Sequence, residues 1–344
     1  MRRSTPGSAL AAGGAVVLGL LAGCSTELPQ PEPDPTAETA PPVLDEERFD
    51  RVLEEVSATI AAADETRDGE ALQSRVTGPA LDMRRAEYRL AEATDGQASP
   101  APITTATQVE AVAATEDFPR TAMTITQVPE GANLPLLMAL TQPEAREQYK
   151  LWGWVELFPG IETPALISPD TGSAQLAPDA EGLVATPAQV VERYVDTLNN
   201  AESEFAGQFA EDPYKKTARE TTAQLDANIE AAGEASISFS VGDSGPLALA
   251  TADGGALVLG ELGSAQTIRK TVPGATLTVG GQIGALLGED KEVRGSVTGT
   301  SDLLVAFYVP PAGGEDATIR PLGATPGGGV LTEVTRDDAA APAE

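Results

Sequence analysis

Apolar residues follow a helical period in the chain from residue 45 onwards. In the segment 45–65 one helix face carries the apolar side chains, namely Phe49, Val52, Leu53, Val56 and Ile60. Acidic residues fill its first turn, where the helix macrodipole favours negative charge. A shorter helical piece at 70–76 follows, and a third helix starts at Gly78-Pro79 and runs through Leu90. The pattern predicts three helical pieces before any strand.

Beyond Pro102 the apolar period changes from helical spacing to alternation. Segments rich in β-forming residues are separated by Pro119, by Pro129-Glu130-Gly131 and by Pro143. Alternation bounded by turn residues is typical of strands. Four strands are expected, at residues 108–115, 121–127, 134–141 and 148–157.

The same order recurs in the second half. Thr186-Pro187 is typical of an N-cap with proline at the first helical position, and a short helical piece around Phe205 and Phe209 precedes a helix from Asp212-Pro213 to Ile229. Strands are then predicted at residues 237–241, 246–251, 256–262, 266–272, 292–298 and 303–309, with a last one near 318–322. The glycine-rich segment 280–288 is expected to be a loop or a short helix.

These patterns predict an α+β fold built of two tandem related domains, each with helices followed by a curved antiparallel sheet. Their expected bounds are 45–165 and 185–335, joined by a polar, turn-rich linker at 166–184 and followed by a disordered tail at 336–344. Helices followed by an antiparallel meander, twice, resemble the nuclear transport factor 2-like or SnoaL-like fold. This resemblance implies helices that pack into the concave face of each sheet.

The N-terminal sequence has the character of an export signal. Arg2 and Arg3 precede an apolar run, and the run ends at Leu21-Ala22-Gly23-Cys24. This ending resembles the lipobox of bacterial lipoproteins. The resemblance implies that residues 1–23 are a signal peptide and that Cys24 carries a diacylglyceryl thioether, which anchors the protein on the extracytoplasmic face of the cell membrane. Residues 24–44, which follow, are acidic and rich in proline, and are expected to be an extended tether.

Composition narrows the chemistry of the chain. It has no histidine and one cysteine, Cys24, so imidazole-based catalysis, Cys-His nucleophiles and metal sites built on His or Cys are unavailable. A formal net charge of −30 argues against nucleic acid as a partner. No catalytic residue, metal ligand or cofactor is predicted. The expected partners are the membrane, through the Cys24 lipid, and an envelope protein or a small-molecule ligand.

Two motifs have the appearance of catalytic or nucleotide sites. The run Gly242-Asp243-Ser244-Gly245-Pro246 resembles the nucleophile segment of chymotrypsin-like proteases, but no imidazole exists to activate Ser244, so a turn between strands is the favoured interpretation. The glycine-rich segment 280–288 lacks the Gly-Lys-Ser/Thr ending that cradles phosphate. Two carboxylates suffice for a glycosidase, which leaves a carboxylate-dependent hydrolase open.

Both tryptophans of the chain, Trp152 and Trp154, lie on one predicted strand and on the same face of it. Such aromatics usually pack in a core. The functional alternative is that they line a ligand pocket or a contact between the domains, with Tyr88, Arg84 and Arg85 as polar neighbours. The arginines themselves, in a basic cluster with Arg89, are expected on a solvated helix face.

The lipobox, the acidic tether and the two α-then-β halves together resemble conserved actinobacterial lipoproteins of unknown function. The leading hypothesis is a non-enzymatic, membrane-anchored binding or assembly module of the cell envelope. A solute-capture lipoprotein that serves a membrane transporter is the first alternative, although such receptors generally alternate strands and helices around parallel sheets. A carboxylate-dependent envelope hydrolase is the second.

Overall fold

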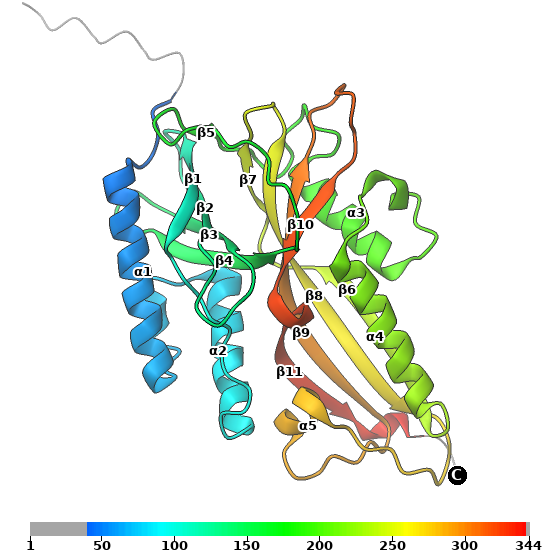
Figure 1. The fold of residues 1–344 in the computed structure, drawn as a ribbon. Coiled ribbons are helices and arrows are strands. Elements are labelled where there is room, and N and C mark those ends of the chain that lie inside the picture. The colour runs from blue at the N-terminus through cyan, green and yellow to red at the C-terminus, as the bar shows by residue number, and fades with distance from the viewer. Residues whose placement is uncertain (1–39, 342–344) are drawn as a thin grey trace, which may run out of the picture. The chain divides into compact units, whose positions relative to one another are not determined.

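Helices form where the sequence pattern predicts them in the first half of the chain. The computed structural model describes residues 40–341 (Figure 1). Helix α1 spans Glu46–Thr66 and begins at Asp45, whose side chain accepts a hydrogen bond from the Arg48 backbone N–H at 2.8 Å. A 3₁₀ turn at Ala71–Ser74 and helix α2 at Gly78–Ala93 follow. The predicted helical face of α1 is its buried face, with Val52 half-buried at its margin.

Five strands complete the first half. They are β1 (Thr107–Ala114), β2 (Arg120–Thr126), β3 (Leu136–Gln142), β4 (Lys150–Leu157) and the short β5 (Ser173–Ala174). The strands β1 to β4 pair as an antiparallel meander, as predicted, and β5 pairs parallel to β1.

The second half also begins with helices. Helix α3 (Pro187–Asn199) starts with a capping box between Thr186 and Gln189, and a 3₁₀ turn at Ala206–Gln208 leads to α4 (Pro213–Ile229). The remaining elements are β6 (Gly233–Val241), β7 (Leu247–Ala250), β8 (Ala256–Lys270), α5 (Gly281–Leu287), β9 (Ser296–Val309), β10 (Arg320–Ala324) and β11 (Val330–Asp337), with 3₁₀ turns at Pro326–Gly328 and Asp338–Ala340.

The strands of the second half differ from the sequence prediction in several places. Strand β6 begins four residues earlier than predicted, at Gly233. The pairs of strands expected at 256–262 and 266–272, and at 292–298 and 303–309, are the single strands β8 and β9. These two strands pair with each other without a break from Ala256↔Val309 to Arg269↔Ser296, which keeps Gly263 extended inside β8. Strand β11 was not predicted, and it includes Arg336 and Asp337 of the expected tail.

Strands of both halves belong to one sheet. The described residues form an 11-stranded sheet in the order β5-β1-β2-β3-β4-β10-β9-β8-β6, with β11 paired to β9 and β7 to β8. The halves meet where β10 pairs with β4, at Gly323↔Leu157 and Ala324↔Glu156. Residues 40–341, which the structure describes, therefore form one compact unit. The α+β class is confirmed, whereas the arrangement as tandem domains is not.

The two faces of β9 are buried against different halves. Leu304, Ala306 and Tyr308 belong to a core cluster with α1, α2 and β1 to β4. The alternating residues Leu303, Val305, Phe307 and Val309 belong to a second cluster with α3 and the start of α4. Burial on both faces explains why the second half of this strand, residues 303–309, is continuously apolar. Figure 1 shows α1 and α2 beside β1 to β4, and α3 and α4 beside β6 and β8.

The segment expected to be a linker, 166–184, is attached to the sheet at several points. It contains β5, and the Gln175 side chain accepts from the Thr121 backbone N–H at 2.9 Å and donates to the Pro119 carbonyl at 2.7 Å. Gln175 also forms an isolated bridge with Leu249, which joins both halves of the chain.

Candidate functional site

A groove of about 920 Å³ lies between α4, the strands β8 and β9, α5 and the loop at 326–329. Small-molecule sites in proteins have volumes of roughly 300–1,000 Å³ and are mostly apolar. This groove is the candidate functional site.

Helix α4 forms one wall of the groove, and its fully buried residues lie only at its start. Asp212 caps it by accepting from the Lys215 backbone N–H at 2.8 Å, and Tyr194 donates to the same carboxylate at 3.0 Å. Tyr214 and Lys215 are the buried residues of α4. Further along, the groove-facing stripe of Ala218, Thr222, Leu225 and Ile229 is only half-buried. Because Ala218 and Thr222 have small side chains, the helix does not fill the space beneath it.

The buried carboxyl group that caps α4 has a perturbed acidity. Burial raises the pKa of Asp212, and the Lys215 backbone N–H and the Tyr194 hydroxyl oppose this change by stabilising the charged form. Burial also raises the pKa of Tyr194 well above its ordinary value. Both groups fix the beginning of α4, and neither lines the groove.

The floor of the groove is a row of small and polar side chains on paired strands. Gln266 of β8 lies in register with Gly299 of β9, and Ser264 with Ser301. Among the described residues, the side chains of Gln266, Ser264 and Ser301 have no hydrogen-bond partner. The side chains of Ile283 and Leu331 cover Gly299, since a Cβ there would lie within 2.9 Å of both. The polar side chains of Ser264, Gln266 and Ser301 line the groove.

The opposite wall is apolar and the rim is made of glycine. Leu277, Val279, Ile283 and Leu331 belong to a buried core cluster, and the partly buried Leu225 and Ile229 of α4 pack against this cluster. Residues 280–281 and 327–329 contribute glycines to the lining, and a Cβ on Gly280, Gly281 or Gly327 would meet no atom within 4 Å. The rim is therefore open at these three glycines.

Charge is nearly absent from the groove. Of the described residues that line it, only Glu156 is charged at neutral pH. Charged residues make up 22% of the whole chain, so the groove is depleted in charge. The groove has no Lys or Arg among these lining residues, so it offers no cationic partner to an anionic ligand.

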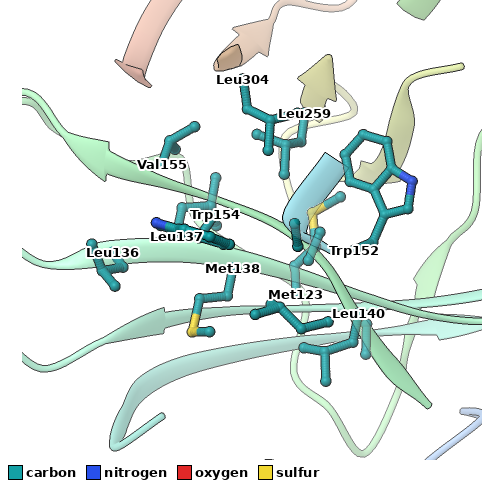
Figure 2. Packing of buried hydrophobic residues seen from close by; sticks show 14 of the residues in the cluster. Met123, Leu136, Leu137, Met138, Leu140, Trp152, Trp154, Val155, Leu259 and Leu304 are labelled. Atoms are coloured by element: carbon teal, nitrogen blue, oxygen red, sulfur yellow. The ribbon is translucent and has the colours of Figure 1, made fainter. Parts of the chain in front are cut away.

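Trp152 and Trp154, the aromatic candidates from the sequence, lie in the core around β4. Their exposed fractions are 7% and 1%, and neither lines the groove. Figure 2 shows both rings among aliphatic and methionine side chains of the neighbouring strands. The Trp152 ring also packs against Gly78 at the start of α2, where a Cβ would lie 3.0 Å from the ring.

Tyr88 and Arg84 meet at a different carboxylate, Asp64 of α1. The Tyr88 hydroxyl donates to Asp64, and Arg84 donates from Nε to Asp64 at 2.9 Å and from Nη1 to Glu87 at 2.9 Å and to the Ala101 carbonyl at 2.7 Å. Burial raises the pKa of Tyr88. Arg84 is 2% exposed, so its expected place on a solvated face is wrong. Asp64 and Glu87 compensate its charge there.

Arg85 has its own partner nearby, since it pairs with Glu70 at 2.5 Å. Asp64 and Arg84 also border a smaller, polar hollow of about 500 Å³ that is lined by residues 99–104. The two arginines thus stabilise the helical part of the first half.

Two sequence candidates remain, namely the segment 242–246 and Cys24. Residues 242–246 form the connection from β6 to β7, as predicted, and the Ser244 backbone N–H donates to Glu261 at 2.7 Å. Cys24 and most of the expected tether lie outside the described residues.

Within 40–341, no group of three or more His, Cys, Asp or Glu side chains is placed to hold a metal ion. No helix in this part of the chain is long and apolar enough to cross a membrane.

Sequence reasoning missed the groove because its residues carry no reactive chemistry. The floor and the helix wall are distant in sequence and come together through pairing of β8 with β6 and β9. Two weak signals were present, namely the mixed small and apolar stripe on α4 and the triple glycine 327–329.

The fold and the groove define an α+β protein with a largely apolar groove beside a long sheet. The chain belongs to the DUF8094 family, described as a domain of unknown function, whose family model matches residues 40–325. No curated protein and no solved structure matches the chain.

Proposed function

We propose that this protein is a membrane-anchored, extracytoplasmic lipoprotein of the bacterial cell envelope that binds a small molecule in the groove beneath α4. The groove carries the binding part of the proposal, because it has the size and apolar lining of a ligand site and is left unfilled by the inner face of α4. The sequence Leu21-Ala22-Gly23-Cys24 supports the anchor.

Binding without turnover is the favoured role. The chain has no histidine, its sole cysteine is the expected lipid attachment site, and the groove is lined by one carboxylate, Glu156. Two carboxylates at a fixed separation are the usual requirement for glycoside hydrolysis. We expect no product when the purified protein is incubated with cell-wall glycans, and turnover that depends on Glu156 would contradict this role.

Native mass spectrometry of the acylated protein, extracted gently from its own membranes, tests the binding function. We expect a co-purifying small molecule that the soluble chain beginning at Ser25 can also retain. The variant Ala218→Trp should lose it, because Ala218 lines the groove, whereas Ala223→Trp on the exposed side of the same helix should keep it. A stoichiometric protein partner without any small molecule would instead indicate an assembly factor.

Cell fractionation tests the anchor. Cys24→Ser removes the thiol that the lipid requires, so we expect the protein to move from the membrane fraction to the soluble exported fraction. Retention of this variant in the membrane fraction would contradict lipid anchoring through Cys24.

The two halves are, in this proposal, related α-then-β units that now share one sheet. Both begin with a helix, a 3₁₀ turn and a second helix that has proline in its first turn, and both continue with antiparallel strands. In each half a helix pair lies beside its own strands, as in the nuclear transport factor 2-like resemblance. Cleavage of the folded chain between the two halves tests whether the units are independent.

A further inference from the structure

Helix α4 leaves an elongated space along its whole length. Lining residues occur from Pro213 to Ile229, which corresponds to about 24 Å of helix at ~1.5 Å per residue. An occupant that contacts this whole helix wall is long.

We propose that the groove binds the hydrocarbon chain of a lipid whose polar part is uncharged, with the chain beside α4 and the polar part at Gln266, Ser264 and Ser301. This assignment rests on the proposed binding function and names its ligand class. The apolar walls of Leu225 and Ile229 on one side and of Leu277, Val279 and Ile283 on the other match methylene groups, which have no polar atoms to satisfy.

An extended polypeptide fits the groove poorly. An extended peptide needs a free sheet edge for its backbone hydrogen bonds, but the floor strand β8 is paired with β6 on one side and with β9 on the other. Its unpaired backbone groups would then be buried without partners.

An uncharged head group follows from the polar atoms that the groove offers. Gln266 provides an amide and the two serines provide hydroxyls, and these neutral groups can donate to and accept from hydroxyl, ester or amide groups. A buried carboxylate or phosphate would lack a cationic partner among the lining residues, and such a burial is strongly unfavourable.

A displacement assay with the soluble chain beginning at Ser25 tests this assignment. The uncharged dye N-phenyl-1-naphthylamine serves as the fluorescent probe, and three competitors are compared: monopalmitoylglycerol, monolauroylglycerol and palmitoyl-lysophosphatidylglycerol. We expect monopalmitoylglycerol to displace the dye at least tenfold more effectively than monolauroylglycerol, because each buried methylene strengthens binding about fourfold. Monopalmitoylglycerol should also displace the dye at least tenfold more effectively than palmitoyl-lysophosphatidylglycerol, the anionic lysolipid with the same acyl chain.

Matched variants locate the site. Ala218→Trp should abolish dye and lipid binding, while Ala223→Trp, the same substitution on the exposed face, should leave both unchanged. Gly280→Trp is a second blocking variant, because Gly280 has a φ of −108° and open space at its Cβ position. Circular dichroism and melting temperature establish that each variant is folded. Gln266→Lys places a cation at the proposed head-group position, so this variant should bind the anionic lysolipid more tightly than monopalmitoylglycerol.

The outcomes separate the ligand class from the binding function. Dye binding that both blocking variants abolish, but that monopalmitoylglycerol does not compete, would overturn the lipid assignment and leave a binding groove. Tighter binding of the lysolipid than of the monoacylglycerol by the unmodified protein would overturn the uncharged head group. Dye and lipid binding that persist unchanged in both blocking variants, or no binding by the unmodified protein, would overturn the groove as the site.

Discussion

Leu304 of β9 occupies the space where a side chain on Gly153 of β4 would lie. A Cβ on Gly153 would overlap the Leu304 Cδ1 atom and would lie 3.6 Å from Leu259 Cδ2. Figure 2 shows Leu304 and Leu259 side by side above β4. All three residues are in strands, and the two leucines come from the second half of the chain. This contact interlocks the two halves inside one core.

Gly153→Ala should destabilise the protein because the added methyl group displaces Leu304, which is fully buried. Overpacking of a filled core typically costs about 1–3 kcal/mol, and we expect a loss of about 1–2 kcal/mol in the free energy of unfolding. Gly207→Ala, where a Cβ meets no atom within 4 Å, is the control and should change it by less than about 0.5 kcal/mol. Denaturant titration measures both.

A compensating change tests the same contact. Leu304→Val removes part of the obstructing side chain, so the double variant with Gly153→Ala should lose less stability than the sum of the two single variants. Simple additivity would show that the methyl group acts elsewhere.

Cleavage of the chain between the two halves should not separate them. A protease site inserted after Gly182, an exposed glycine with a φ of +93°, allows the folded protein to be cut there. We expect the two pieces to elute together in gel filtration and to separate only in denaturant, because one core cluster contains residues of both halves. Elution as two stable, separate pieces would support independent tandem domains.

Arg84→Ala should be far more harmful than the loss of a surface arginine. Its removal leaves Asp64 and Glu87 without their buried cation, and breaking such a cluster typically costs about 3–5 kcal/mol. Arg51 pairs with Glu47 at 3.7 Å on the exposed face of α1, so Arg51→Ala should cost less than about 1 kcal/mol. Thermal unfolding measures both, and equal effects would contradict the burial argument.

Asp302 makes stability depend on pH. Burial, together with the charges of Glu261, Asp82 and Asp243, raises the pKa of Asp302 to about 6. Between pH 4 and 6 the folded state then binds more protons than the unfolded state, so this group lowers stability as pH rises through that window. Asp302→Asn removes the free-energy cost of ionising this carboxyl group in the folded protein. We expect the variant to be more stable above pH 6 by on the order of 1 kcal/mol, a figure that allows for solvent screening of this half-exposed group.

Melting temperatures measured from pH 4 to pH 8 test this prediction. The gain from Asp302→Asn should be about 2 °C at pH 8 and should shrink towards pH 4. Glu333→Gln, on an exposed position of β11, is the control substitution. A gain from Asp302→Asn that is the same at every pH would exclude titration of Asp302 as its cause.

The sequence predicted most helices and strands because their signals are local. Thr186 and Asp212 cap helices through hydrogen bonds three residues away, and the Gly78-Pro79 start of α2 depends on the same short range. It missed β11 and divided β8 at Gly263, since these outcomes depend on pairing with a distant strand, β9. The aromatic pair Trp152 and Trp154 attracted a site prediction, yet both rings are buried in the core and the groove uses Gln266 and small residues instead.

The sequence by itself determined that helices precede strands in each half, the α+β class and the absence of histidine chemistry, because propensity, caps and composition need no knowledge of distant contacts. Only the tertiary structure decided that Leu303 and Leu304 face two different cores and that one sheet runs through both halves. It also decided that Ala218 and Gln266 border an open groove rather than a packed interface. These relationships arise from the register of β8 with β6 and β9, which joins residues far apart in the chain and is invisible to any local pattern.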